Sequence, residues 1–356
     1  MHINKQYQLE SMKIKALVRK NIEELTPYSS ARDEFKSTSD FIYLDANEGS
    51  YDNKLNRYPD NRHIQLNKLI SSFKNVNTNN LILCNGTDEL IDLVIRVFCN
   101  PCLDKIITLN PTYGMYDISS RINDVENIKI DLDINFQIDI NKVLSSFDSN
   151  TKVIFITNPN NPTGNSFTNE AIIKIIESFK GIVFIDEAYV DYSNISYLKK
   201  INSYNNLIVS QTFSKAIGLA GIRLGVGYSN QEIISYLKKI KPPYNINSLT
   251  EKKAIESLER EYVNIDQVNE TINERKFLEL KLKELAFVQV VFPSNSNFLL
   301  IKVDDADKRY KQLIDYGIVV RNRSNVRGCE NCLRVTVGTP QQNKILINTL
   351  KKIWKK

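Results

Sequence analysis

Between about residues 80 and 228, short runs of apolar, mostly β-branched residues alternate with amphipathic stretches, and this alternation constrains the fold most. The apolar runs lie at 81–84, 105–109, 127–130, 152–157, 181–186, 206–211 and 224–228. Because they lack a period of two, they indicate strands that are covered on both faces. Helical patterns intervene at 88–98 and 169–179. The sequence therefore predicts an α/β fold with a mostly parallel central sheet sandwiched by helices.

The pattern changes after Pro242 and Pro243. Residues 248–285 form one long, charged stretch of helical character with almost no Gly or Pro. Further apolar runs at 287–291, 297–303, 317–320 and 333–337 alternate with helical segments. This part predicts a long helix followed by a smaller α+β domain.

The residue inventory excludes several classes of protein. With 42% hydrophobic and 25% charged residues in 356, the chain is of globular type. It has only two histidines, His2 and His63, which argues against a Ser-His-Asp triad or a His-rich metal centre. We expect His63 on a solvated helix face.

The net charge of +6 is mild and no basic stripe carries interleaved aromatic residues, so we expect no nucleic-acid partner. The N-terminus lacks a secretory signal and no apolar stretch reaches membrane-spanning length. We therefore expect a cytoplasmic protein that does not bind membranes.

Five cysteines include two CxxC pairs, Cys99 with Cys102 and Cys329 with Cys332. The pairs are far apart in sequence, whereas zinc sites usually place them about 15–20 residues apart. We interpret them as ordinary core and turn cysteines and expect no metal.

Polar residues follow three of the predicted strands directly. Asn158 to Gly164, with the sequence NPNNPTG, come after the run at 152–157, and DEAY begins with Asp186 at the end of the next run. The third run is followed by TFSK, which ends in Lys215. Because ligands bind at the carboxyl ends of the strands in an open parallel sheet, we expect these residues to line one crevice.

These residue types suit pyridoxal phosphate. The cofactor needs a lysine amine for its aldehyde, an acid for its pyridine nitrogen and an anion site for its phosphate. Lys215 and Asp186 would supply the first two. Arg223, the hydroxyls of Thr212 and Ser214, and the helix N-terminus at the NGTDE segment (85–89) would bind the phosphate.

The combined motifs carry a resemblance to a known family. NPNNPTG, DEAY, TFSKAIGLAGIRLG and NGTDE resemble the aspartate-aminotransferase-type (fold type I) pyridoxal-phosphate enzymes. LTPY, YLDANE, NRYPD, PTYGMY, GIVVRNRS and CLRVTVGT extend the resemblance to histidinol-phosphate aminotransferases over roughly residues 20 to 340. No single motif is decisive, and the order of the whole set is what makes the resemblance specific.

The resemblance implies roles for single residues. Lys215 would bind the cofactor covalently and shuttle the proton between substrate Cα and cofactor C4′. Asp186 would bond the pyridinium nitrogen, Asn161 and Tyr189 would hold the phenolic oxygen, and Tyr113 would stack on the ring. The implied phosphate ligands are Gly86, Thr87, Asp88, Thr212, Ser214 and Arg223. Tyr58 would reach the phosphate of a partner subunit, which implies a homodimer.

The resemblance also implies a division into three parts. Residues 1–49 would form an N-terminal segment that contributes to the small domain and the active-site entrance. Residues 50–247 would form a large cofactor-binding domain, and residues 248–356 a linking helix with the small domain.

Substrate binding depends on fewer residues. Arg334 resembles the arginine that binds the substrate α-carboxylate in aminotransferases, and a site that also accepts a phosphate ester needs a second arginine, for which Arg321 is placed. Tyr28 would add a hydroxyl donor, and Asn47 in YLDANE is a further candidate. The family commonly has a proline soon after ANE, whereas this chain continues with Gly49 and Ser50.

The implied reaction transfers an amino group between L-histidinol phosphate and 2-oxoglutarate, giving imidazole-acetol phosphate and L-glutamate, as in histidine biosynthesis. A threonine-phosphate decarboxylase and an aromatic-amino-acid aminotransferase of the same fold remain alternatives. A transcription regulator with an aminotransferase-like domain is disfavoured, because the residues before YLDANE contain no evident helix-turn-helix.

Overall fold

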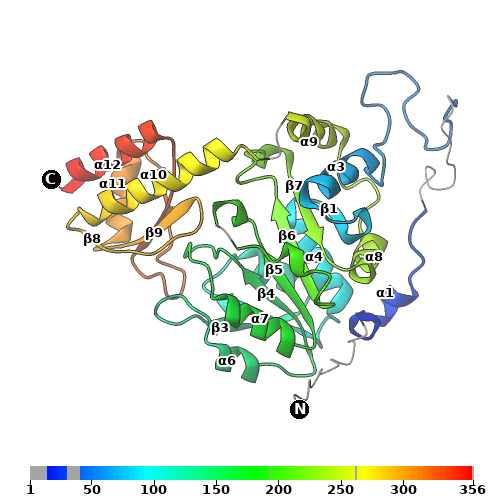
Figure 1. Ribbon diagram of the computed structural model, residues 1–356, viewed down its shortest axis with the longest axis horizontal. Helices are drawn as coiled ribbons and strands as arrows, with labels where there is room; N and C mark the ends of the chain where they lie inside the picture. Colours follow the sequence, from blue (N-terminus) through cyan, green and yellow to red (C-terminus); the bar gives the residue numbers. More distant parts are fainter. Residues whose placement is uncertain (1–13, 30–40, 194, 261–262, 355–356) are drawn as a thin grey trace, which may run out of the picture.

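The computed structural model describes residues 14–29, 41–193, 195–260 and 263–354, and its largest element is a seven-stranded sheet (Figure 1). The strand order is β1-β7-β6-β5-β4-β2-β3. Strands β2 to β6 pair in parallel, and β7 runs antiparallel to both β1 and β6. The strands are β1 (Leu81–Asn85), β2 (Lys105–Asn110), β3 (Glu126–Asp131), β4 (Thr151–Thr157), β5 (Ile182–Asp186), β6 (Leu207–Thr212) and β7 (Leu224–Tyr228). The predicted mostly parallel α/β sheet is confirmed.

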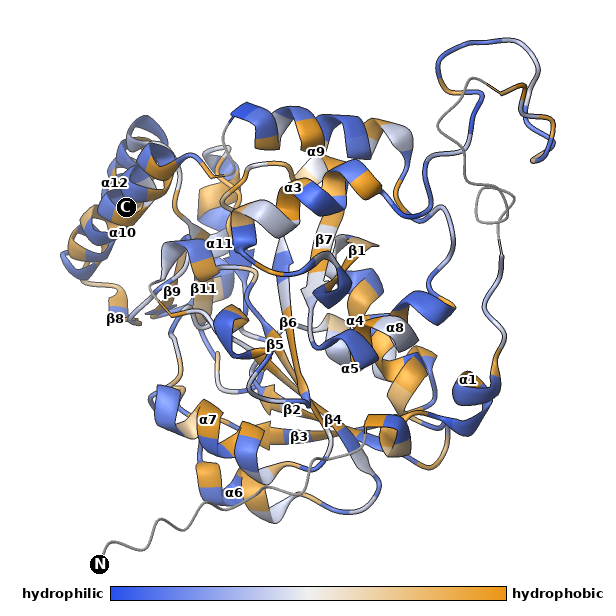
Figure 2. Cartoon of the chain, turned by 45° about the vertical axis from the view of Figure 1, so that its right-hand side comes forward, coloured by the Kyte–Doolittle hydropathy of each residue, from blue (hydrophilic) through white to orange (hydrophobic). Residues whose placement is uncertain are grey.

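Helices cover both faces of this sheet because its strands are apolar on both faces (Figure 2). In β4, Ile154 and Ile156 belong to one core, whereas Val153 and Phe155 belong to the other. The first core is closed by helices α3 (Ile64–Lys74), α6 (Ile140–Ser145), α7 (Asn169–Ser178) and α9 (Ser248–Arg260). The second is closed by α4 (Gly86–Phe98), α5 (Met115–Ile122) and α8 (Gln231–Ile240).

A second, antiparallel sheet has the order β10-β11-β9-β8. Its strands are β8 (Val288–Val291), β9 (Phe298–Val303), β10 (Arg321–Asn322) and β11 (Cys332–Thr336). Helices α10 (Ile265–Lys283), α11 (Ala306–Asp315) and α12 (Pro340–Trp354) pack on one of its faces. Leu333 of β11 faces these helices, so its neighbour Arg334 lies on the opposite face.

Two sequence expectations for this part were wrong. The stretch 248–285 forms two helices, because Asn264 caps α10 by accepting a hydrogen bond from the Gln267 amide at 2.9 Å. The run 317–320 is no strand: after the turn at Gly317, where φ is +75°, it leads the chain to β10.

The described N-terminal residues pack with the large sheet. Ile14 lies in η1 (Ile14–Leu17), Ile22 lies in α1 (Lys20–Glu24), and both belong to the core that α4 and α8 close. Ala254 of α9 lies in the opposite core of the same sheet. The division into domains at residues 49 and 247 stays a prediction, although these contacts join both flanking segments to the large sheet.

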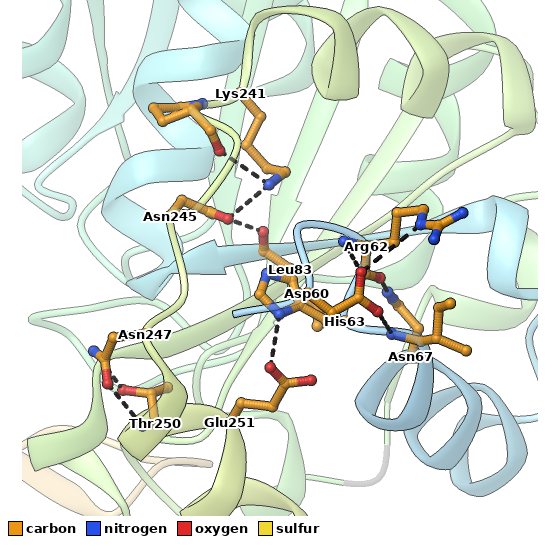
Figure 3. Close-up of polar contacts among 12 residues, drawn as sticks. Asp60, Arg62, His63, Asn67, Leu83, Lys241, Asn245, Asn247, Thr250 and Glu251 are labelled. Atoms are coloured by element: carbon orange, nitrogen blue, oxygen red, sulfur yellow. Dashed lines mark hydrogen bonds and ion pairs between the residues drawn. The ribbon is translucent and has the colours of Figure 1, made fainter. Parts of the chain in front are cut away.

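His63 is buried rather than solvated, so that expectation was wrong (Figure 3). Its Nδ1 lies 3.0 Å from Glu251 Oε2 of α9, and its backbone precedes α3 in a left-handed conformation. A carboxylate brought in by a helix far along the chain therefore accounts for the burial of this imidazole.

The cysteines are core and turn residues, as expected. Cys84, Cys99, Cys329 and Cys332 are buried, and exposed Cys102 donates to Asp124 Oδ2 at 2.7 Å. Within the described ranges, no group of His, Cys, Asp and Glu is arranged to hold a metal ion. In the same ranges, no helix is long and apolar enough to cross a membrane.

Glu187, directly after β5, is buried and ties a loop to β6. Its carboxylate accepts hydrogen bonds from Ser196 Oγ and Gln211 Nε2, both at 2.8 Å, and from the Tyr197 amide. Burial raises the pKa of Glu187 to about 7, because desolvation outweighs these three donors.

We predict that Glu187→Gln removes a pH dependence of stability. The raised pKa means that the folded protein binds this proton more tightly than the unfolded chain, so the stabilisation is complete below the ordinary pKa near 4.5 and is lost as the pH rises through about 7. Between pH 5 and 8.5, the wild type should lose about 2–3 kcal/mol relative to the variant. Urea unfolding at both pH values measures this difference; parallel curves for the two proteins would contradict it.

Candidate active site

Twelve of the predicted site residues line one cavity of about 360 Å³ at the carboxyl ends of β4, β5 and β6. This is where an open parallel sheet binds its ligands. The twelve are Thr87, Asp88, Tyr113, Asn161, Asp186, Tyr189, Thr212, Ser214, Lys215, Arg223, Arg321 and Arg334. The large sheet and its loops supply the first ten, and the small sheet supplies the two arginines Arg321 and Arg334.

Asp186, the last residue of β5, is a buried carboxylate whose hydrogen-bond partners are all neutral. Tyr116 Oη donates to Oδ2 at 2.9 Å, and Ser210 Oγ and the Ala188 amide donate to Oδ1 at 3.1 Å. Burial raises the pKa of Asp186 even though these donors oppose the rise. A cation placed against this carboxylate would stabilise its charged form.

The amine of Lys215 faces the same cavity. Its Nζ lies 5.6 Å from the centre of the Tyr189 ring. Burial lowers the pKa of Lys215, and the positive charge of Arg334 lowers it further. A lowered pKa increases the neutral fraction of the amine, which is the form that attacks a carbonyl or accepts a proton.

At the other end of the cavity, the N-terminus of α4 meets the segment after β6. The first amides of a helix have no partner within it, so this end favours an anion. Thr212 Oγ1 and Ser214 Oγ lie 3.1 Å apart, and Arg223 Nη2 lies 3.5 Å from Asp88 Oδ2. Asp88 Oδ1 accepts from Tyr113 Oη at 3.0 Å, which orients that ring.

Two glycines allow a close approach around Gly86, to the Arg223 side chain on one side and to the backbone of β7 on the other. A Cβ on Gly86 would lie 2.7 Å from Arg223 Nη2, and one on Gly225 of β7 would lie 2.5 Å from both Gly86 C and Thr87 N. Glycine at these positions keeps the arginine and the helix N-terminus close together, which forms a compact cradle for an anion.

Asn161 links the two sheets across the cavity. Arg334 Nη1 donates to its Oδ1, and the Arg334 guanidinium lies 5.3 Å from the Phe298 ring. In the small sheet, Arg321 pairs directly with Arg334 across β10 and β11. Two guanidinium groups therefore face the region of the Lys215 amine.

Four predicted site residues are not among those that line this cavity: Gly86, which precedes the lining residue Thr87 in α4, and the more distant Tyr28, Tyr58 and Asn47. Tyr28 is exposed and lines a separate cavity with His63. Tyr58 stacks on Tyr244 with ring centres 4.5 Å apart, and half of its surface is exposed. Asn47 has a φ of +54° and is not among the lining residues.

Four residues that no sequence motif indicated as site residues also line the cavity: Thr157, Ala188, Ala220 and Arg323. For Arg323 a signal existed, because residues two apart in a strand point to the same side and Arg321 was already a candidate. The two alanines carry no chemical signal. Tyr116, the last residue of PTYGMY, was not predicted as a site residue, because its hydrogen bond to Asp186 depends on the packing of α5.

The family model for class I and II aminotransferases matches residues 31–350. The chain belongs to this family. A histidinol-phosphate aminotransferase of Flavobacterium psychrophilum is 49% identical to this aminotransferase over 345 residues, which cover 96% of the chain and 99% of the relative.

Solved structures agree on the fold. The crystal structure of the histidinol-phosphate aminotransferase from Clostridium acetobutylicum superimposes with a TM-score of 0.78 at 28% identity, covering 85% of this chain and 92% of that one. An L-threonine-O-3-phosphate decarboxylase from Porphyromonas gingivalis reaches 0.71 at 22% identity, with 85% and 92% coverage. The fold is thus shared by a decarboxylase, and fold alone does not separate the two reactions.

Pyridoxal phosphate is the cofactor of this family, and the residues of this aminotransferase fit it. Buried Asp186 has neutral partners only among the described residues, as a carboxylate that meets a pyridinium nitrogen requires. The close approach at Gly86 and Gly225 suits a phosphate, and Lys215 lines the same cavity as Asp186.

We predict that Gly225→Ala weakens cofactor binding by roughly tenfold. The added methyl must push away Gly86 and Thr87, and overpacking of this kind costs about 1–3 kcal/mol. Titration of the cofactor-free protein with pyridoxal phosphate, followed by absorbance, measures the dissociation constant.

Gly221→Ala is the matched control, since a Cβ at Gly221 would meet no atom within 4 Å. Equal dissociation constants for Gly225→Ala and the wild type would mean that the cradle does not bind the phosphate.

Proposed function

We propose that this enzyme transfers an amino group between L-histidinol phosphate and 2-oxoglutarate, giving imidazole-acetol phosphate and L-glutamate, in histidine biosynthesis in the cytoplasm. Curated relatives nearly half identical over almost the whole chain are histidinol-phosphate aminotransferases. The observation that carries the proposal is the pairing of Arg321 with Arg334 beside the Lys215 amine, because both substrates bring at least two negative charges.

The predicted site residues have the following roles in this proposal. Asp186 holds the proton on the pyridine nitrogen, Asn161 and Tyr189 bond the phenolic oxygen, and Tyr113 packs on the ring. Bound pyridoxal phosphate supplies an electron-withdrawing ring that stabilises negative charge at the substrate Cα. The phosphate ligands are Gly86, Thr87, Asp88, Thr212, Ser214 and Arg223.

Lys215 performs the proton transfers. Its Nζ takes the proton from the substrate Cα and delivers it to cofactor C4′. The lowered pKa of Lys215 suits an amine that must be neutral at the start. Arg334 binds the carboxylate next to the reacting carbon, and Arg321 binds the far anionic group.

The decarboxylase alternative binds similar substrate groups and differs in its product. Loss of carbon dioxide from O-phospho-L-threonine would identify it, and an aromatic-amino-acid aminotransferase would prefer phenylalanine to histidinol phosphate. The relatives favour transamination of a phosphorylated donor.

A direct test uses the absorption spectrum of the holoenzyme. L-histidinol phosphate should convert the visible band of the bound cofactor to the pyridoxamine form, and 2-oxoglutarate should restore it. We predict that Lys215→Ala abolishes the visible band and lowers turnover by at least about 10³-fold, since amine and proton carrier are lost together.

Lys344→Ala, an exposed lysine of α12, serves as control and should behave as the wild type. Near-normal turnover in Lys215→Ala would contradict the proposed role of this lysine. A visible band that does not change on addition of histidinol phosphate would contradict the proposed substrate and favour O-phospho-L-threonine or an aromatic amino acid.

We propose further that the enzyme acts as a homodimer in which Tyr58 reaches the cofactor phosphate of the partner. Large apolar side chains are exposed between residues 25 and 58, which is unusual for a free surface: Leu25, Tyr28, Phe41, Ile42, Leu44, Tyr51, Leu55 and Tyr58. A second copy of the chain would cover them, and Tyr28 and Asn47 lie in the same segment.

We predict a dimer at micromolar concentration in sedimentation velocity. Tyr58→Phe removes only the hydroxyl and should weaken the affinity for pyridoxal phosphate roughly tenfold, the value of one charge-assisted hydrogen bond, without dissociating the dimer. A fully active monomer, or a Tyr58→Phe enzyme with unchanged affinity, would contradict the proposed contact.

A further inference from the structure

Arg323 lines the active-site cavity, and neither the motifs nor the roles above give it a function. Its amide donates to the Cys332 carbonyl at 2.8 Å, which continues the pairing of β10 with β11 by one residue. Because side chains two apart in an extended segment share a side, Arg323 lies on the same side as Arg321. Arg334, directly opposite Arg321, completes a row of three guanidinium groups.

The guanidinium of the partly buried Arg323 lacks partners of the kind that the buried arginines Arg275 and Arg309 have. Its Nε is buried and has no hydrogen-bond partner among the described residues. By contrast, Arg309 bonds Asp304 through Nε and Nη2, and Arg275 Nη1 donates to the Ser296 carbonyl. Arg323 therefore lines the cavity with a guanidinium group that has an unpaired donor.

Its surroundings are positively charged. Burial lowers the pKa of Arg323, and the charges of Arg334 and Arg321 lower it further. Across the ranges that the structure describes, none of the three arginines has an ion pair with a carboxylate, whereas Arg223 of the cofactor end is paired with Asp88. Like charges gathered without a counterion are unfavourable, so the row is suited to a strongly anionic ligand.

Among ligands of an aminotransferase, a phosphate monoester matches three guanidinium groups best. It carries about −1.5 to −2 charge in one group with three acceptor oxygens, and arginine binds such oxygens in pairs. A carboxylate has one charge and two oxygens, which Arg334 or Arg321 can satisfy alone.

We propose that Arg323 is a specificity-determining residue whose guanidinium binds the phosphate monoester of the amino donor, which deepens the proposed function and rests on it. Arg323 would thereby distinguish a phosphorylated donor from glutamate, whose two carboxylates are separate single charges. Its removal should affect one half-reaction and spare the other.

The test compares Arg323→Gln with the wild-type holoenzyme in both half-reactions. Loss of one charge-assisted contact should lower kcat/KM for L-histidinol phosphate about 10- to 100-fold. The values for unphosphorylated L-histidinol and for L-glutamate should change less than about threefold, a change too small to represent a lost hydrogen bond.

Arg327→Gln is the matched control, because Arg327 belongs to the same loop but pairs with Asp131 outside the cavity at 2.5 Å. Arg323→Lys keeps the charge and loses the forked geometry, so it should fall between the wild type and Arg323→Gln. If Arg323→Gln does not fold, the lysine variant carries the same comparison.

The outcomes separate this inference from the proposed function. If the wild type converts histidinol phosphate and Arg323→Gln loses equal activity toward all donors, or none, the specificity role is overturned and the function stands. If the wild type instead decarboxylates O-phospho-L-threonine, the proposed function is overturned. The role of Arg323 then stands only if Arg323→Gln loses affinity for O-phospho-L-threonine more than for L-threonine, compared with the wild type. A wild type with equal kcat/KM for phosphorylated donors and for their unphosphorylated counterparts overturns both the proposed function and the role of Arg323.

Discussion

The buried carboxylate of Asp186 is the constraint on which the active site depends. A charge at the end of a central strand is costly unless its surroundings provide donors, and here Tyr116 of α5, Ser210 of β6 and the Ala188 amide do so. These donors come from elements on different sides of β5, so the arrangement of sheet and helices must be complete before the carboxylate is tolerated. The residual cost, visible as a raised pKa, is what a cationic cofactor nitrogen would offset.

The same sheet explains how much of the site could be predicted from the sequence. Its strands are covered on both faces, so their apolar runs are nearly continuous and their ends are marked by abrupt polar residues. The positions of Asp186, Lys215 and Asn161 at these ends follow from that pattern and from the rule for parallel sheets. Their types then pointed to pyridoxal phosphate, which the family match supports.

What could not be predicted depends on contacts between distant parts of the chain. The burial of His63 requires Glu251, and the break between α9 and α10 depends on the capping side chain of Asn264 within an otherwise helical pattern. Tyr28, Asn47 and Tyr58 lie outside the cavity of the single chain, and no pattern within one sequence shows what a second copy would contribute. Such residues are found by resemblance rather than by periodicity.

The division of labour between the two sheets also bears on substrate choice. The large sheet holds the groups that fit the cofactor, and the three arginines that line the same cavity as Lys215 come from β10, β11 and the residue after β10. The bond from Arg334 Nη1 to Asn161 Oδ1 joins the two sets, so one of the proposed substrate arginines is held against a residue of the large-sheet side of the cavity. The charge of Arg334 also lowers the pKa of Lys215, so a substitution of this arginine would affect both the bound anion and the lysine.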